Sequence, residues 1–296
     1  MTPEVEIQYG DYVARIRREG GGLNSLSYKG RNLVDPFQAS DPRFFRGDVL
    51  APWPNRIADG KYEVEGKSYT VAINEAERRT ALHGLVFSML WEVLDASQDH
   101  LRLGVDLPAS SSYPTSLHLE VTYRLSADGL SISISAENTG SAKAPYGVSI
   151  HPYLIASEGQ SVDQWTLKLH SNQVLDVDEV RLLPIALKSC EEMNFDFRDG
   201  AKIGTRFIDH AFTVDDSKPR TISLRADNGA GVEMTFDETS QWVQIHTADR
   251  DGGDTSRRCL AVEPMTCPPD AFRSGEDLIW LGAGDKTESS WRIHNL

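Results

Sequence analysis

Residues 117–138 read LHLEVTYRLSADGLSISISAEN, and the alternation within them determines the fold class. Ile132 and Ile134 alternate with serines in the second half. Apolar side chains take every second position of the first half: Leu117, Leu119, Val121, Tyr123 and Leu125. A period of two is typical of antiparallel strands with one buried face. Asp128-Gly129 readily supplies the positive φ of a tight turn, so the stretch predicts a β-hairpin.

The same pattern extends along most of the chain. Residues 61–71, KYEVEGKSYTV, predict a second hairpin that turns at Glu65-Gly66. Helical periodicity is nearly absent, and the 23 glycines and 14 prolines are spread evenly rather than gathered in one linker. Many short strands separated by turn signals predict an all-β protein, a large antiparallel β-sandwich. We expect a single domain over residues 1–296.

The composition excludes several classes of partner. The chain has 296 residues, of which 40% are hydrophobic and 25% charged, as is ordinary for a soluble globular protein. Its formal net charge is −14, with 44 acidic and 30 basic side chains. A surface this acidic repels polyanions, so we expect no nucleic-acid partner and no attachment to anionic membranes.

From the cysteine usage and the first residues of the chain, we expect a cytoplasmic protein. The three cysteines, Cys190, Cys259 and Cys267, form no CxxC pair, so neither a disulfide framework nor a zinc ribbon is expected. The first ten residues, MTPEVEIQYG, lack the basic and apolar segments of a signal peptide. No apolar run approaches the roughly 18 residues that a membrane span requires.

An imidazole interrupts an apolar segment at residues 147–156, GVSIHPYLIA. His151 stands between Ile150 and Leu154, and Pro152 ends the strand directly after it. Two interpretations are open. His151 either closes a strand and meets solvent, or it is a proton donor held at the mouth of a cleft.

Two further polar residues lie next to proline or glycine residues. Arg56 comes after two prolines in LAPWPNRIADG, residues 50–60, so a stiff rim segment presents its guanidinium. His83 precedes Gly84 in TALHGLVF, residues 80–87, and glycine permits close approach of a ligand or of other backbone. The alternatives are an arginine that caps buried carbonyl groups and a purely structural histidine.

Two carboxylates also occupy strand segments. In RFIDHAF, residues 206–212, neighbouring side chains point to opposite faces, so only one of Asp209 and His210 can face a given cleft. Glu263 ends an apolar strand in CLAVEPMTCPP, residues 259–269, and burial would raise its pKa toward that of a general base. The alternatives are an aspartate that receives turn amides and an exposed glutamate on an edge strand.

Together these residues indicate acid–base chemistry on a polyhydroxylated ligand. No pair of histidines has metal-ligand spacing, and no phosphate-binding or dinucleotide-binding motif is present, so we expect no metal and no organic cofactor. His246 alternates with Gln244 and therefore could face the same cleft. Three tryptophans could stack on a sugar, but we expect them in the core: Trp53, Trp91 and Trp242.

The motifs resemble the aldose 1-epimerase, or galactose mutarotase, family. PWPNRIADGKYEVEGKSYTVAINE followed by ALHG is similar to its N-terminal signature, HPYL to its catalytic histidine segment, IDHAF to its substrate-binding aspartate segment and AVEPMTCPPDAF to its catalytic glutamate segment. The matches keep the family's order from Pro52 to Phe272. The resemblance implies a sandwich of the galactose mutarotase type that interconverts the α and β anomers of a hexose.

The resemblance also implies roles for the five residues. Glu263 is the base and His151 the acid, which would be protonated with an unperturbed pKa near 6.5. His83 would hold or polarise oxygens near the sugar ring, while Arg56 and Asp209 would bind hydroxyl groups. The partner is then a small sugar, and the protein is a monomer or a homodimer.

Some positions depart from the better-known galactose enzymes. Ile150 and Pro152 stand where those enzymes have Asn and Ser, and Leu85 stands where a second glycine is common. HPYL is closer to a divergent, largely bacterial branch, in which one relative resembles a sulfoquinovose mutarotase; a neighbouring branch acts on hexose 6-phosphates.

Two other functions therefore stay open. An epimerase of a sugar phosphate or sulfonate would need further cationic side chains near the cleft, for which the candidates are Arg43, Arg46, Arg78 and Arg79. A non-catalytic carbohydrate-binding protein would not need the Glu263–His151 pair.

Overall fold

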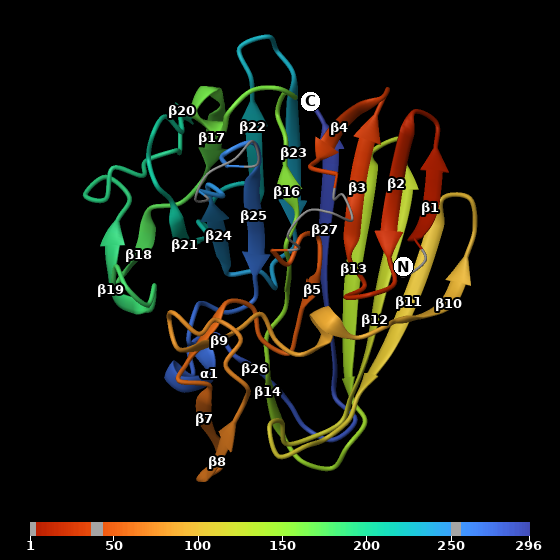
Figure 1. Cartoon of the computed structure of the whole chain (residues 1–296), viewed down its shortest axis with the longest axis vertical. Coiled ribbons are helices and arrows are strands. Elements are labelled where there is room, and N and C mark those ends of the chain that lie inside the picture. The colour runs from red at the N-terminus through yellow and green to blue at the C-terminus, as the bar shows by residue number, and fades with distance from the viewer. Residues whose placement is uncertain (1–3, 37–43, 250–255) are drawn as a thin grey trace.

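The computed structural model describes residues 4–36, 44–249 and 256–296, and strands make up nearly all of their regular structure. Two large sheets dominate, and their paired strands run antiparallel (Figure 1). Within these ranges, helical structure is limited to α1 (Ala271–Ser274) and two short 3-10 turns, η1 (Val86–Ser88) and η2 (Val162–Gln164). The all-β, antiparallel prediction is confirmed.

The first sheet has ten strands. In sheet order they are β1 (Glu4–Tyr9), β2 (Tyr12–Arg17), β3 (Leu23–Tyr28), β4 (Arg31–Val34), β16 (Tyr153–Leu154), β25 (Leu260–Met265), β24 (Trp242–His246), β21 (Asp209–Thr213), β18 (Gln173–Val177) and β19 (Pro184–Ser189).

The second sheet has nine strands. In sheet order they are β10 (Glu92–Ala96), β11 (His100–Leu107), β12 (Leu117–Ser126), β13 (Gly129–Asn138), β27 (Lys286–Asn295), β23 (Gly231–Phe236), β22 (Thr221–Arg225), β17 (Thr166–Leu169) and β20 (Ala201–Lys202).

Four two-stranded pairs complete the described part of the chain. They are β5 (Val49–Leu50) with β15 (Ser149–Ile150), β6 (Arg56–Ala58) with β9 (Thr80–Leu82), β7 (Lys61–Val64) with β8 (Lys67–Thr70), and β14 (Ala144–Tyr146) with β26 (Ile279–Leu281).

Both predicted hairpins are present. β12 and β13 pair from Leu117↔Asn138 to Ser126↔Gly129, and the five alternating apolar side chains of β12 are all at most 1% exposed. β7 and β8 turn at Glu65 and Gly66, whose φ values of 51° and 78° are the positive angles of a tight hairpin.

Strand β25 is unusual because every one of its side chains is buried. It lies in the middle of the first sheet, between β16 and β24, so neither face is open to solvent along its length. Cross-strand pairs set what surrounds it: Glu263 is opposite Gln244, and Asp209 on β21 is opposite His246. This register brings four polar side chains to one region of the sheet.

The expectation that the three tryptophans lie in the core is confirmed. Trp53, Trp91 and Trp242 are at most 3% exposed and belong to the core. None of the helices in the described residues has the length and hydropathy needed to cross a bilayer.

Candidate active site

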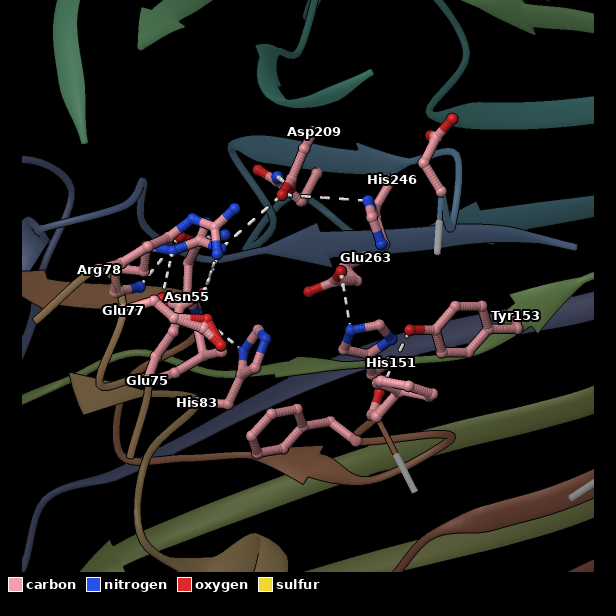
Figure 2. A pocket seen from close by; sticks show the side chains of 16 residues that line it. Asn55, Glu75, Glu77, Arg78, His83, His151, Tyr153, Asp209, His246 and Glu263 are labelled. Carbon is pink, nitrogen blue, oxygen red and sulfur yellow. Dashed lines mark hydrogen bonds and ion pairs between the residues drawn. The ribbon is translucent and has the colours of Figure 1, made fainter. Parts of the chain in front are cut away.

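A cavity of about 330 Å³ opens beside β21, β24 and β25 (Figure 2). All five residues predicted for the site line it, together with His246. The described residues that line it are Phe44, Phe45, Asn55, Arg56, Glu75, Glu77, Arg78, Leu82, His83, His151, Tyr153, Asp209, Gln244, His246, Asp249 and Glu263.

Glu263 and His151 meet directly in this cavity. His151 Nε2 lies 3.3 Å from Glu263 Oε1, and the two side chains are 5% and 2% exposed. Glu263 comes from β25, and His151 from the turn between β15 and β16, where Pro152 interrupts the strand as expected. Backbone hydrogen bonds on both sides fix that turn: His151 N–H donates to Asp48 O, and Gly47 N–H donates to His151 O.

Burial shifts the pKa values of Glu263 and His151 in opposite directions. Desolvation, with a further contribution from Asp209, raises the pKa of the Glu263 carboxyl well above its usual range. Desolvation, reinforced by His246, lowers the pKa of His151 to about 3. Both shifts favour the neutral forms, with the shared proton on Glu263 rather than on His151. The expectation that His151 titrates near 6.5 is wrong, because the imidazole is enclosed rather than held at a solvated mouth.

His83 is fixed in one tautomer. The backbone N–H of Asn55 donates to His83 Nδ1 at 3.1 Å, so Nδ1 is unprotonated and the proton is on Nε2. Figure 2 shows that second nitrogen directed toward His151 and Glu263. Desolvation and the neighbouring His151 keep the pKa of His83 well below its usual value. His83 is thus a neutral N–H donor into the cavity.

Gly84 explains how His83 reaches this position. Its φ is +78°, and a Cβ atom placed on it would lie 2.0 Å from the carbonyl oxygen of Ala51. The close backbone approach expected from the His-Gly sequence is therefore real, and it is an approach of backbone rather than of ligand.

Arg56 and Asp209 are held as charged groups. Arg56 Nε and Nη2 donate to the two Glu75 carboxylate oxygens at 2.8 and 3.0 Å, and Nη2 lies 3.7 Å from Asp209 Oδ2. Burial alone would lower the pKa of Arg56, but Asp209 and Glu75 raise it. Burial alone would raise the pKa of Asp209, but His246 and Arg56 lower it. Gln244 Nε2 also donates to Asp209 Oδ1 at 2.6 Å.

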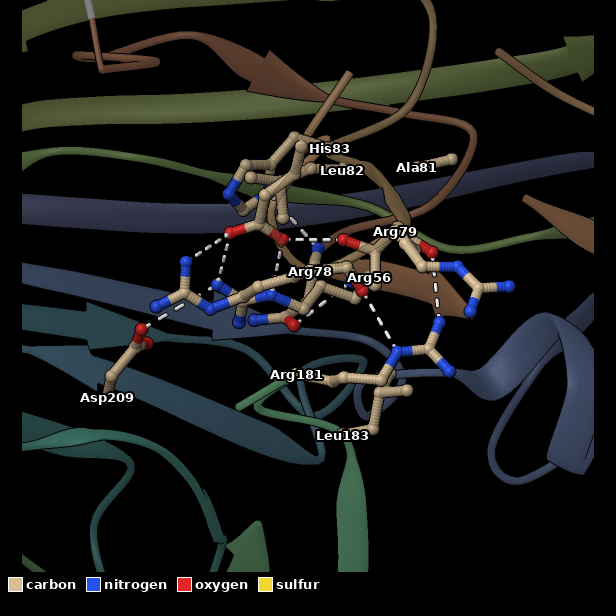
Figure 3. A network of polar contacts seen from close by, with 12 residues as sticks. Arg56, Arg78, Arg79, Ala81, Leu82, His83, Arg181, Leu183 and Asp209 are labelled. Atoms are coloured by element: carbon tan, nitrogen blue, oxygen red, sulfur yellow. Dashed lines mark hydrogen bonds and ion pairs between the residues drawn. The ribbon is translucent and has the colours of Figure 1, made fainter. Parts of the chain in front are cut away.

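A second layer of contacts holds the loop that carries Glu75 (Figure 3). Thr80 Oγ1 donates to Glu75 Oε2, and Arg78 Nη1 lies 3.3 Å from Glu75 Oε1. Arg181, between β18 and β19, donates to the backbone carbonyl oxygens of Arg78 and Arg79 at 2.9 and 3.0 Å. The rim of the cavity is thus tied to a segment about a hundred residues further along the chain.

The four candidate arginines for an anionic sugar are placed differently. Arg78 lines the cavity. Arg46 is buried, pairs with Asp35 and is not a lining residue, while Arg79 is exposed and pairs with Asp59. Arg43 lies outside the described residues.

The contributions of Glu75, Tyr153 and Gln244 were not predicted. The alternation of Gln244 with His246 on β24 was the one available signal, since both side chains lie on the face that holds the cavity. His246 Nδ1 lies 3.9 Å from Asp209 Oδ2 and is a buried atom without a hydrogen-bond partner in the described part of the chain.

His83, His151 and Glu263 bring ligand-type atoms within 4.8 Å of one another. A metal would need the lone pair of His83 on the nitrogen that faces the cavity. That nitrogen carries a proton, because the other nitrogen accepts from Asn55. The cluster therefore suits proton transfer and hydrogen bonding better than metal coordination.

Comparison with known proteins identifies the family of the chain. The model of the aldose 1-epimerase family matches residues 3–294. The Escherichia coli protein YihR, which is uncharacterized, is 39% identical over 283 residues, covering 95% of this chain and 89% of YihR. Human galactose mutarotase is 27% identical over 233 residues, covering 74% of this chain and 66% of the human protein.

Solved structures share the fold. A GalM/aldose epimerase homologue from Caenorhabditis elegans superposes with a TM-score of 0.86 at 20% identity, and the match covers 100% of both chains. Galactose 1-epimerase from Lactobacillus acidophilus gives a TM-score of 0.82 at 17% identity, covering 99% of this chain and 94% of that one. The chain belongs to the aldose 1-epimerase family.

Proposed function

We propose that this isomerase interconverts the α and β anomers of a hexose, with Glu263 and His151 exchanging protons with the sugar. The observation that carries the proposal is the contact of a buried carboxyl with a buried imidazole inside a solvent-open cavity. Ring opening of a hemiacetal removes the proton of the C1 hydroxyl and adds one to the ring oxygen. One base and one acid on either side of the C1–O5 unit are therefore required.

The protonation states available to Glu263 and His151 suit this reaction cycle. Ionised Glu263 takes the C1 hydroxyl proton while protonated His151 gives its proton to O5, and the C1–O5 bond breaks. Both groups are then neutral, which is the state that burial favours. After rotation about C1–C2, the reverse transfers close the ring on the other face. The desolvated site thus favours opening, since opening neutralises two buried charges.

The remaining lining residues hold the sugar. His83 donates its Nε2 proton to an oxygen near C1, and the Arg56–Asp209 pair offers a donor and an acceptor to ring hydroxyls. This chemistry calls for neither a metal nor an organic cofactor. The three free buried thiols fit the reducing cytoplasm that we propose as the compartment.

The charge of the lining favours a neutral hexose. Among the lining residues that the structure describes, acidic side chains outnumber basic ones even with Glu263 neutral: Glu75, Glu77, Asp209 and Asp249 against Arg56 and Arg78. Arg56 is already paired on two sides. A negatively charged sugar would therefore meet net repulsion at most positions in the cavity.

One observation favours a second candidate, a hexose that carries a phosphate or sulfonate. Arg78 lies at the end of the cavity away from Tyr153 (Figure 2), and its Nε is buried without a hydrogen-bond partner among the described residues. An anionic substituent at that end would satisfy this nitrogen.

A panel of sugars tests the proposal. Exchange between anomers, followed by NMR with and without enzyme, should accelerate for at least one of D-glucose, D-galactose, D-glucose 6-phosphate and sulfoquinovose. Acceleration confined to the last two would select the second candidate. Binding of a panel sugar without faster exchange would identify a carbohydrate-binding protein instead and refute the epimerase.

A further inference from the structure

We propose that the same cavity also hydrolyses aldono-1,5-lactones to aldonic acids, an inference that rests on the proton-transfer roles given above to Glu263 and His151. Addition of water to such a lactone gives a ring with two oxygens on C1. This adduct differs from a pyranose only in having a second hydroxyl where the sugar has hydrogen. Its collapse breaks the same C1–O5 bond, deprotonates an oxygen on C1 and protonates O5.

Space for the second oxygen follows from the proposed function itself. A site that accepts both anomers must accommodate an oxygen on each face of C1, although a pyranose fills only one face at a time. The lactone adduct fills both. The cavity has a volume of about 330 Å³, whereas one water molecule takes about 30 Å³ in the liquid. One additional oxygen atom is therefore small relative to the cavity.

Lactone hydrolysis also needs a fixed donor for the carbonyl oxygen, and His83 is placed to provide it. Negative charge develops on that oxygen when water attacks, and preorganised N–H donors in buried sites stabilise such charge strongly. The hydrogen bond from Asn55 N–H to Nδ1 leaves the proton of His83 on Nε2 and aims it into the cavity. His83 therefore needs no reorganisation to act as this donor.

The proposed steps balance. Ionised Glu263 removes a proton from water as the water oxygen bonds to C1, and the carbonyl oxygen becomes an oxyanion held by His83. The oxyanion then re-forms the C=O bond as the C1–O5 bond breaks, and protonated His151 gives its proton to O5. The product is the hydroxy acid, while Glu263 ends protonated and His151 neutral. For the next turnover, proton transfer from Glu263 to His151 across their 3.3 Å contact regenerates the ionised pair when a new substrate binds.

The lining also favours product release. The aldonic acid ionises on leaving, and its carboxylate faces the acidic majority of the cavity lining, including Asp209 and Asp249. The neutral lactone experiences no such repulsion.

The experiment uses the full chain with D-glucono-1,5-lactone and D-galactono-1,5-lactone, at mildly acidic pH to slow the uncatalysed reaction. NMR follows lactone loss, and the mutarotation of α-D-glucose and α-D-galactose is measured in parallel. We expect faster hydrolysis of the lactone whose parent sugar is turned over. Glu263→Gln and His151→Asn should each lose about 100-fold or more of that acceleration, the lower range of general acid–base catalysis. Arg79→Gln, on an exposed side chain outside the cavity, is the matched control.

The outcomes separate the two proposals. Mutarotation of a sugar without acceleration of its lactone overturns the lactonase and leaves the epimerase intact. Full lactone hydrolysis in folded Glu263→Gln overturns the proposed lactonase mechanism, because the base would then not be Glu263. Lactone hydrolysis without mutarotation overturns the epimerase alone. Failure with all four compounds overturns both activities for neutral hexoses.

Discussion

The ring of Tyr153 stacks on the ring of His151, with centroids 4.8 Å apart and planes inclined by 23°. The guanidinium of Arg46 lies 5.0 Å from the centroid of the same Tyr153 ring, and Arg46 is itself paired with Asp35. Tyr153 therefore connects the imidazole to a buried ionic pair behind the cavity. This stack fixes the plane in which His151 approaches Glu263.

Removing the stacked ring should slow the reaction. We expect Tyr153→Leu to lower kcat for anomer exchange about 10-fold or more, because a small misplacement of a proton donor is costly. Tyr153→Phe keeps the ring and should stay close to wild type, although it loses the hydrogen bond to Phe44 O. NMR exchange kinetics on both variants measure the difference. Equal rates in Leu and Phe variants would show that the stack does not position His151.

Loss of either proton-transfer group should abolish catalysis without unfolding the protein. Glu263→Gln and His151→Asn are each expected to reduce kcat by about 100- to 10,000-fold. Polarimetry on freshly dissolved α-anomers gives the rate, and circular dichroism gives the fold. Activity near the wild-type level in one folded variant would remove that residue from its assigned role.

The buried carboxyl should make stability depend on pH. Because the folded-state pKa of Glu263 is raised above 4.5, wild-type stability is lost as pH rises from 4.5 through that raised value. Glu263→Gln removes this loss. The free energy of unfolding of the variant, relative to that of wild type, should therefore rise by up to about 1.4 kcal/mol per pH unit in that window. Urea titrations at a series of pH values measure the gain. Glu77→Gln, on an exposed rim side chain, should show no such trend.

The imidazole of His151 makes stability depend on pH in the opposite direction. Its folded-state pKa of about 3 lies below the ordinary 6.5, so the stability it contributes is lost as pH falls through that interval. His151→Asn should therefore be less sensitive to acid than wild type in the same urea titrations. Parallel pH profiles for wild type and variant would contradict the burial-driven shift.

Arg78 distinguishes the two candidate substrates. If an anionic substituent binds its free Nε, Arg78→Gln should lower the ratio of kcat/KM for the anionic sugar to that for the neutral sugar by about 10- to 100-fold, the value of a charged hydrogen bond. Arg79→Gln, next in sequence but outside the cavity, should leave the ratio unchanged. An unchanged ratio in Arg78→Gln rules out this side chain as an anion-binding group.

Gly84 should be intolerant of any side chain. Gly84→Ala places a methyl group 2.0 Å from Ala51 O. It is expected to lower the free energy of unfolding by more than ~1 kcal/mol, the upper size of the gain that glycine-to-alanine changes give where the backbone is compatible. Gly66→Ala has the same φ of +78° but no heavy atom within 4 Å, so it should cost only about 1–2 kcal/mol. Urea denaturation of both variants separates steric conflict from backbone strain.

The fold and much of the site could be predicted from the sequence because their signals are local. The β12–β13 hairpin follows from alternation and an Asp-Gly turn, both contained in 22 residues. The five predicted site residues stand out because each is a polar side chain beside a proline, a glycine or an apolar strand. Those local signals marked the residues. The register of β21, β24 and β25 then brings Asp209 and Glu263 to one region of the sheet, and Arg56, His83 and His151 reach the same cavity from outside these strands.

The remaining contacts depend on segments far apart in the chain. Glu75 lies in a loop that Arg181 holds from the connection between β18 and β19. The neutral state of His151 depends on complete enclosure by residues from several strands, which no pattern around GVSIHPYLIA could reveal. Strand length and alternation carry no information about either effect.

Strand β25 lies in the middle of its sheet and all of its side chains are buried, and this has a practical consequence. Its glutamate meets the imidazole only when β25 lies against β16, and β16 pairs in turn with β4. Partial melting at this junction dissolves the proton-transfer pair, while the sheet of β10 to β13 is still intact. Catalytic turnover measured during chemical denaturation would thus report on the pairing of β25 with β16. If the two sheets unfold separately, activity should be lost at a lower denaturant concentration than the bulk spectroscopic signal.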